Sequence, residues 1–263
     1  MNVAYHNLHW TFMSRVRFLR QLVCLPLFIC FLMIARPTMT LAAENVDLQL
    51  LLAVDSSSSV SDAEFDLQMR GFAQAFRDPD VQAAIRGAGD RGVAVAMIHW
   101  SGADSQVIAQ DWSLLFGADG ANSFADSLDQ TPRYVERGST ALGSMLDYAG
   151  AMLRASPYTG QRQVIDISGD GRANQGKPLA PEREALLTQD VTINGLAILN
   201  EDDTLDRYYR EQVINGTGAF LITATDYEDF ARAIRRKLLR ELEGAPLSHR
   251  QQRGQGIQLS QGN

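Results

Sequence analysis

Six apolar runs recur along the chain, with polar or amphipathic segments between them. The first run, residues 46–54, is almost continuously apolar and ends at Asp55. Such a run is typical of a strand that is buried on both faces of a parallel sheet. The other five runs lie at residues 92–100, 105–112, 163–168, 191–199 and 219–223. We therefore predict six strands.

An amphipathic helix is predicted directly after the first strand. Its apolar face is formed by residues at spacings of three and four, namely Phe65, Met69, Phe72 and Phe76. Ser61 and Glu64 stand three residues apart at its start, which is the pattern of a capping box. The serine run at 56–59 therefore leads from a strand into a helix.

Further helices are predicted near residues 142–153, 181–190, 204–214 and 225–242. Thr225 and Glu228 form a second candidate capping box at the start of the last helix. Only residues 101–104 separate the second and third strands, which predicts an antiparallel hairpin with Ser101 and Asp104 in its turn. The repeated alternation of strand and helix predicts an α/β fold, a doubly wound and mostly parallel sheet with helices on both faces.

The first 43 residues have the pattern of a targeting segment. Three arginines, Arg15, Arg17 and Arg20, precede a run of 14 apolar residues, and small residues follow at 40–43. This order is typical of a secretory signal peptide, and the run is shorter than the roughly 20 residues that span a membrane. An uncleaved anchor is the alternative. We expect cleavage near Ala42 or Ala43.

Cleavage would leave one domain over residues 44–243 and a polar, disordered tail over residues 244–263. The segment over residues 1–43 holds four arginines and no acid, so its loss changes the net charge from −7 to −11. Cys24 and Cys30 are lost with it, which leaves no thiol for a disulfide or a metal site. An acidic chain also argues against a nucleic-acid partner. We expect a periplasmic or secreted protein with no membrane span in its mature chain.

Oxygen-bearing side chains follow two of the predicted strands. Asp55 ends the first strand, with Ser57 and Ser59 at alternate positions in the next loop, and Asp170 follows the fourth strand. Thr140 precedes the helix at 142–153. Ligands of doubly wound sheets bind outside the carboxyl ends of the strands. Two carboxylates with hydroxyls form an oxygen-only set that suits Mg²⁺ or Mn²⁺.

The D-x-S-x-S loop at 55–59, the Thr140 loop and the Asp170-Gly171 turn resemble, in this order, the metal-ion-dependent adhesion site (MIDAS) of the von Willebrand factor type A (vWA) superfamily. The resemblance covers about residues 46–243 and is closest to an exported bacterial branch of unassigned function. It implies a six-stranded, Rossmann-type sheet with one antiparallel edge strand. It also implies a divalent cation held directly or through water by Asp55, Ser57, Ser59, Thr140 and Asp170. Two departures are that Ser168-Gly169 precedes the aspartate where many members have a threonine, and that no adhesive repeats are attached.

Each part of this set also has a simpler interpretation. Serines before a helix often serve only as caps and turn residues, and Asp170 between glycines could be a turn residue. The acidic stretch at 201–203 is expected to be a solvated loop. His99, Trp100 and Trp112 are expected to be structural residues that pack in or beside strands.

Three functional hypotheses remain. The leading one is a binding module that uses its cation to engage an acidic side chain of a protein partner. A metal-dependent hydrolase, such as a phosphatase, is the alternative, because an aspartate at a strand end with Mg²⁺ also suits phosphoryl transfer. Aspartyl phosphatases need a second aspartate at position 57, which is Ser57, and a G-x-S-x-G elbow would need glycine in place of Asp166. The third hypothesis is a cell-envelope assembly protein with a metal-free site.

Overall fold

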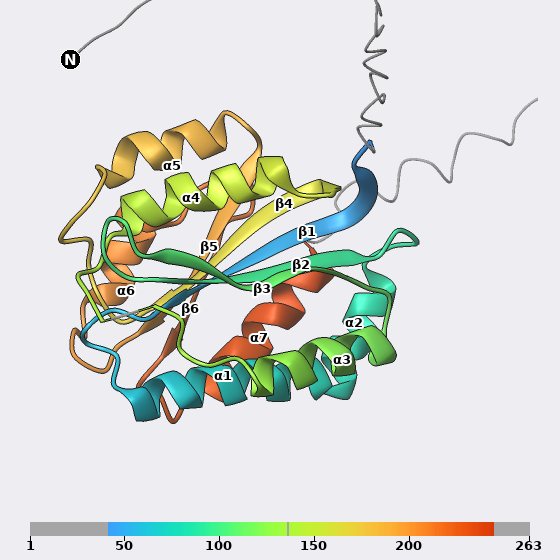
Figure 1. Ribbon diagram of the computed structural model, residues 1–263, viewed down its shortest axis with the longest axis horizontal. Helices are drawn as coiled ribbons and strands as arrows, with labels where there is room; N and C mark the ends of the chain where they lie inside the picture. The colour runs from blue at the N-terminus through green and yellow to red at the C-terminus, as the bar shows by residue number, and fades with distance from the viewer. Residues whose placement is uncertain (1–41, 136, 245–263) are drawn as a thin grey trace, which may run out of the picture. The chain divides into compact units, whose positions relative to one another are not determined.

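A mostly parallel sheet forms the centre of the domain in the computed structural model, which describes residues 42–135 and 137–244. Its strand order is β3-β2-β1-β4-β5-β6 (Figure 1). The strands are β1 (Glu44–Asp55), β2 (Val93–Trp100), β3 (Gln106–Leu115), β4 (Tyr158–Gly169), β5 (Val191–Ile198) and β6 (Leu221–Ala224). β3 lies at one edge and pairs antiparallel with β2, whereas every other pair of neighbouring strands is parallel. The predicted six-stranded α/β sheet with one antiparallel edge strand is confirmed.

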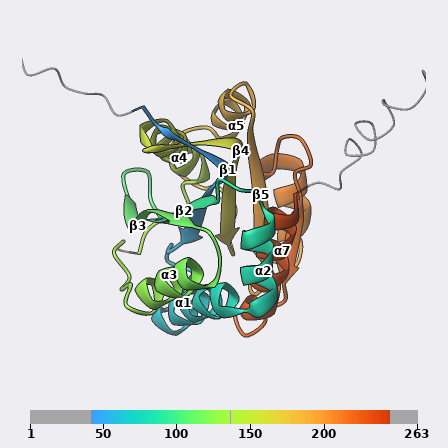
Figure 2. The ribbon, with the colours of Figure 1, turned by 90° about the vertical axis from the view of Figure 1, so that its right-hand side faces the viewer.

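Helices cover both faces of this sheet (Figures 1 and 2). One face carries α1 (Asp62–Arg77), α2 (Pro79–Gly87), α3 (Ala118–Asp129) and α7 (Phe230–Glu243). The other face carries α4 (Leu142–Ala155), α5 (Leu179–Leu187) and α6 (Leu205–Tyr208), which continues as the π-helix η1 (Tyr209–Val213). Leu50 and Leu52 of β1 pack with the first group, and Leu51 and Ala53 pack with the second. Burial on both faces explains why β1 is continuously apolar.

The two predicted capping boxes have different outcomes. At α1, the Glu64 N–H donates to Ser61 Oγ at 3.3 Å, and the Ser61 N–H donates to Glu64 Oε2 at 2.8 Å. The first box is therefore confirmed. The second is wrong, because α7 begins only at Phe230, with Asp229 as its N-cap residue. The Thr225 N–H donates to Asp229 Oδ2 at 3.2 Å, so residues 225–229 form a turn before the helix.

Two helices, α2 and α3, were not predicted from the sequence. Both lie on the same face as α1, where they bury Val81 and Ile85 of α2 and Phe124 and Leu128 of α3. α2 lies between α1 and β2 in the chain, and α3 lies between β3 and α4. The remaining predicted elements agree with the structure apart from shifts at their ends.

The predicted signal segment and tail lie almost wholly outside the described residues, because residues 1–41 and 245–263 are not described. β1 begins at Glu44, directly after the expected cleavage positions Ala42 and Ala43. In the part of the chain that the structure describes, no helix has both the length and the apolar character to cross a membrane.

Candidate functional site

The candidate site lies where the carboxyl ends of β1 and β4 meet. These strands are parallel neighbours, with Val54 opposite Ser168, so Asp55 and Asp170 leave the sheet at the same edge. The chain passes from β1 to β2 on one side of β1, and later returns to place β4 on the other side. This is the point at which strand order reverses, and ligands of doubly wound sheets bind there.

Four of the five predicted site residues form one chain of hydrogen bonds. The Ser57 N–H donates to Asp55 Oδ1 at 2.7 Å, and the hydroxyls of Ser57 and Ser59 lie 3.1 Å apart. Ser59 Oγ in turn donates to Asp170 Oδ1 at 2.7 Å. The structure therefore links the two carboxylates, which are 115 positions apart in the sequence, through the two serines that the D-x-S-x-S spacing singles out.

Thr140, the fifth predicted residue, lies beside the turn that follows Asp170. Its backbone is fixed by Asn174, whose Oδ1 accepts from the Thr140 N–H at 2.9 Å and whose N–H donates to the Thr140 carbonyl at 3.0 Å. A methyl group placed on Gly171 would lie 3.1 Å from Thr140 Oγ1. The threonine hydroxyl is thus held against the Asp170-Gly171 turn, and all five residues lie in one cluster.

The cluster holds more negative charge than its surroundings balance. Asp55 is fully buried, and its Oδ2 has no hydrogen-bond partner among the described residues. Burial, with a smaller contribution from the charge of Asp170, raises the pKa of Asp55 to about 7. Burial also raises the pKa of Asp170. A cation placed between two such carboxylates would favour their ionised forms, so the electrostatics of the cluster fit a bound cation.

The donor set is made of oxygen alone. Within residues 42–135 and 137–244, no three His, Cys, Asp or Glu side chains come together in a way that could hold a metal. The cluster offers two carboxylates and three hydroxyls instead. This composition matches the preference of Mg²⁺ and Mn²⁺ for hard oxygen ligands and water, and it does not match the nitrogen and sulfur ligands of a structural zinc site.

Arg133 is a site residue that the sequence did not indicate. Its Nη2 donates to the carbonyls of Ser56 at 2.6 Å and Ser57 at 3.1 Å, and its Nη1 donates to the carbonyl of Val60 at 2.9 Å. One guanidinium group therefore fixes three carbonyls of the loop that carries Asp55. No local motif marks this arginine, because its partners lie more than 70 positions away in the sequence.

Two tyrosines also reach the cluster without any signal in the sequence. The hydroxyl of Tyr227, in the turn before α7, donates to Asp170 Oδ2 at 2.9 Å. Tyr209, the first residue of η1, is fully buried, and the charge of Asp55 contributes to the raised pKa of its hydroxyl after burial itself. Both tyrosines therefore remain protonated and can act only as neutral hydroxyl groups near neutral pH.

The residues expected to be structural have that role. His99 is buried, its ring meets Phe65 edge-on with centroids 5.0 Å apart, and burial lowers its pKa to about 3. Trp100 is fully buried, and Trp112 packs against the core on the α4 face. In the acidic stretch at 201–203, Asp202 forms an ion pair with Arg172 at 2.7 Å, and this contact lowers its pKa.

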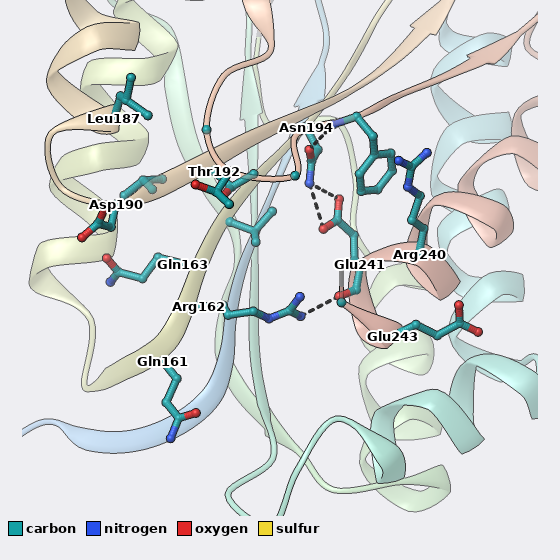
Figure 3. A pocket seen from close by; sticks show the side chains of 17 residues that line it. Gln161, Arg162, Gln163, Leu187, Asp190, Thr192, Asn194, Arg240, Glu241 and Glu243 are labelled. Atoms are coloured by element: carbon teal, nitrogen blue, oxygen red, sulfur yellow. Dashed lines mark hydrogen bonds between the residues drawn. The ribbon is translucent and has the colours of Figure 1, made fainter. Parts of the chain in front are cut away.

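A cavity of about 760 Å³ lies away from this cluster, at the opposite ends of β4 and β5 (Figure 3). Its polar groups bond to one another: Asn194 Nδ2 donates to Glu241 Oε1 and Oε2 at 2.8 and 3.0 Å, and Arg162 Nη2 donates to the Glu241 carbonyl at 2.6 Å. These bonds tie the end of α7 to the sheet. We assign the cavity no ligand.

A family model described as "Protein of unknown function (DUF1194)" matches residues 45–246. The chain belongs to this family. Comparison of the DUF1194 chain with curated protein sequences gives no match. The matched range contains the described sheet from the second residue of β1 onwards and all five clustered residues.

Solved structures show the fold of this DUF1194 protein. The SpRpn10 VWA domain matches with a TM-score of 0.53 and 12% identity over 76% of this chain and 98% of that domain. Proximal thread matrix protein 1 from the mussel byssus, with a zinc-occupied MIDAS motif, matches with a TM-score of 0.51 and 16% identity over 75% of this chain and 46% of that chain. The pilus adhesin SpaC from Lactobacillus rhamnosus GG matches with a TM-score of 0.51 and 16% identity over 74% of this chain and 30% of that chain. The chain thus spans less than half of the last two proteins. The fold is vWA-like.

Proposed function

We propose that this DUF1194 protein is an exported, non-catalytic binding module that holds Mg²⁺ or Mn²⁺ at Asp55, Ser57, Ser59, Thr140 and Asp170. The observation that carries the proposal is that two buried carboxylates, Asp55 and Asp170, lie in one hydrogen-bonded cluster with the hydroxyls of Ser57 and Ser59. Two buried carboxylates without a balancing charge are costly, and a cation between them would supply that charge. The mussel protein, which has a similar fold, holds zinc at a MIDAS motif, and this supports a metal-binding role.

The partner that we propose is a protein with an exposed acidic side chain. Two aspartates roughly neutralise a divalent cation, and any coordination position left to water can accept one further carboxylate. The rigid loop, fixed by Arg133 at three carbonyls, keeps the ligand oxygens in place during this exchange. The similarity to a pilus adhesin supports a role in adhesion or protein binding.

Isothermal calorimetry of the purified protein with Mg²⁺ and with Mn²⁺ tests the metal site. Asp55→Ala and Asp170→Ala should each abolish binding, because each removes one of the two charges that balance the ion. Asp126→Ala is a matched control, since its carboxylate is 66% exposed in an ion pair with Arg77 on the surface. Unchanged metal affinity in both site variants would overturn the assignment.

Capture of partners from a cell-envelope extract tests the second part of the proposal. We expect a partner that binds wild type in Mg²⁺, is released by EDTA, returns when Mg²⁺ is restored, and does not bind Asp55→Ala. Binding that is indifferent to EDTA and to the variant would instead indicate an envelope protein with a metal-free site. Mg²⁺-dependent hydrolysis of phosphate esters that Asp55→Ala abolishes would overturn the non-catalytic assignment.

A further inference from the structure

Tyr209 and Tyr227 each face one of the two site carboxylates. Tyr227 already bonds to Asp170 Oδ2 at 2.9 Å, while Asp170 Oδ1 accepts from Ser59. Both oxygens of Asp170 are therefore occupied, and the carboxylate is held in one orientation. Tyr209 comes from another part of the chain, and its hydroxyl has no hydrogen-bond partner among the residues that the structure describes.

The unpartnered oxygens of Tyr209 and Asp55 share one small space beside Gly169. A methyl group built on Gly169 would lie 2.8 Å from the Tyr209 hydroxyl and 2.9 Å from Asp55 Oδ2. Both distances are too short for any side chain, so glycine at this position leaves the two oxygens facing the same gap. Two buried polar atoms that lack partners and border one gap point to a hydrogen bond that forms in another state of the site.

The local backbone of Tyr209 is consistent with such a role. α6 ends at Tyr208 and the helix continues as the π-helix η1, which starts at Tyr209. A π-helical turn is a rare local irregularity that occurs frequently at functional sites. Here the π-helix begins at Tyr209, whose hydroxyl borders the same gap as Asp55 Oδ2.

We propose that Tyr209 and Tyr227 are positioning residues of the cation site, each holding the oxygen of one aspartate that faces away from the cation. This inference rests on the proposed metal-binding function. Tyr227 holds Asp170 by its existing bond, and the Tyr209 hydroxyl donates to Asp55 Oδ2 once the cation orders that carboxylate. The remaining oxygens then face the ion: Asp55 Oδ1, which accepts from the Ser57 N–H, and Asp170 Oδ1, which accepts from the Ser59 hydroxyl. Hydrogen-bond partners of metal ligands typically contribute roughly 10–100-fold to metal affinity.

Tyr209→Phe separates this role from a purely structural one. In EDTA the variant loses a buried hydroxyl that has no partner, so its melting temperature should equal or exceed that of wild type. Its Mg²⁺ and Mn²⁺ affinities, measured by calorimetry, should nevertheless fall at least roughly 10-fold. A residue that only packs would give the same melting temperature result, because phenylalanine keeps the ring, but its metal affinity would be unchanged. The affinity is therefore the measurement that decides between the two roles.

Tyr227→Phe and Tyr148→Phe complete the experiment. Tyr227→Phe should also weaken metal binding, but with a lower melting temperature in EDTA, because it removes an existing bond to Asp170. Tyr148→Phe is the matched control, since Tyr148 of α4 packs against the same apolar cluster as Tyr209, and it should leave both quantities unchanged.

The outcomes distinguish the inference from the function on which it rests. If wild type binds a cation, Asp55→Ala abolishes binding and both tyrosine variants bind as wild type does, only the positioning role is overturned. If folded wild type binds neither Mg²⁺ nor Mn²⁺, the metal-binding function and the positioning role fail together.

Discussion

At the scale of single residues, the buried group formed by Lys237, Asp166 and Glu241 contributes to the pH dependence of the domain's stability. Lys237 Nζ lies 2.6 Å from Asp166 Oδ1 and 3.1 Å from Glu241 Oε1, and all three side chains are buried. Two acids share one base, so one acid is left without a compensating charge. Burial raises the pKa of Asp166 to about 7, with Lys237 opposing the shift and Glu241 adding to it. A proton on Asp166 would make the group neutral.

Asp166→Asn tests this linkage. The pKa of Asp166 in the folded state lies above its ordinary value of 3.8, so the folded state binds more protons than the unfolded state between about pH 4 and pH 7. The contribution of Asp166 to stability is therefore greatest near pH 4 and is lost as the pH rises towards 7. Between pH 4 and pH 7, the free energy of unfolding of the variant should rise relative to that of wild type by on the order of a few kcal/mol. Above pH 7 this difference should stay constant.

Urea unfolding in EDTA, repeated between pH 4 and pH 8, measures the difference between the two proteins. Asp55 and Asp170 titrate in both and cancel in this difference. The charged groups near Asp166 are Lys237 and Glu241 of α7, together with Arg162, which donates to the Glu241 carbonyl. These groups are present in both proteins. A difference that does not change with pH would contradict the raised pKa.

The candidate site itself could largely be predicted from sequence, because short-range spacing determines most of it. Asp55, Ser57 and Ser59 stand at alternate positions, and the local turn at residues 57–60 brings the two serine hydroxyls together. Tyr209 and Tyr227 could not be predicted. Their hydroxyls reach the cluster only because η1 and the turn before α7 pack beside the ends of β1 and β4. Contacts that depend on tertiary packing in this way leave no periodic pattern in the local sequence.

At the scale of elements, the two candidate capping boxes provide a direct comparison. Ser61→Ala removes an observed cap of α1 and should lower the free energy of unfolding by about 1 kcal/mol. Thr225→Ala removes a residue of the same pattern that caps no helix, and its exposed position should limit the change to about 0.5 kcal/mol. Urea midpoints measured in EDTA give both values. Equal losses in the two variants would contradict the assignment of the caps.

The same comparison shows why the sequence predicted some elements and not others. S-x-x-E marks α1 because an apolar face follows it at once, whereas Thr225 is followed by a turn in which Asp229 accepts the Thr225 N–H. α2 has a start signal in Asp78 and Pro79, but its apolar face consists only of Val81 and Ile85. Two apolar residues give too little periodicity to identify a helix. The apolar face of α3 is half alanine, which weakens its contrast with the polar face.

At the scale of the whole molecule, the predicted cleavage position lies directly before Glu44, where β1 begins. Glu44 is the first residue of β1 and pairs with Tyr158 of β4, so the sheet begins at Glu44. Cleavage after Ala42 or Ala43 would remove the whole apolar segment and no residue of the strand. Cleavage further along the chain would expose the edge of β4, its neighbour in the sheet.

Export with processing at this point is therefore the prediction for the full-length chain. We expect the protein recovered from the periplasm or medium of a bacterial host to begin at Ala43 or Glu44 by intact-mass spectrometry, and to migrate as a more acidic species because its net charge falls from −7 to −11. A chain that starts with Met followed by Glu44 should fold but stay in the cytoplasm. A full-length chain in the membrane fraction would instead support an uncleaved anchor.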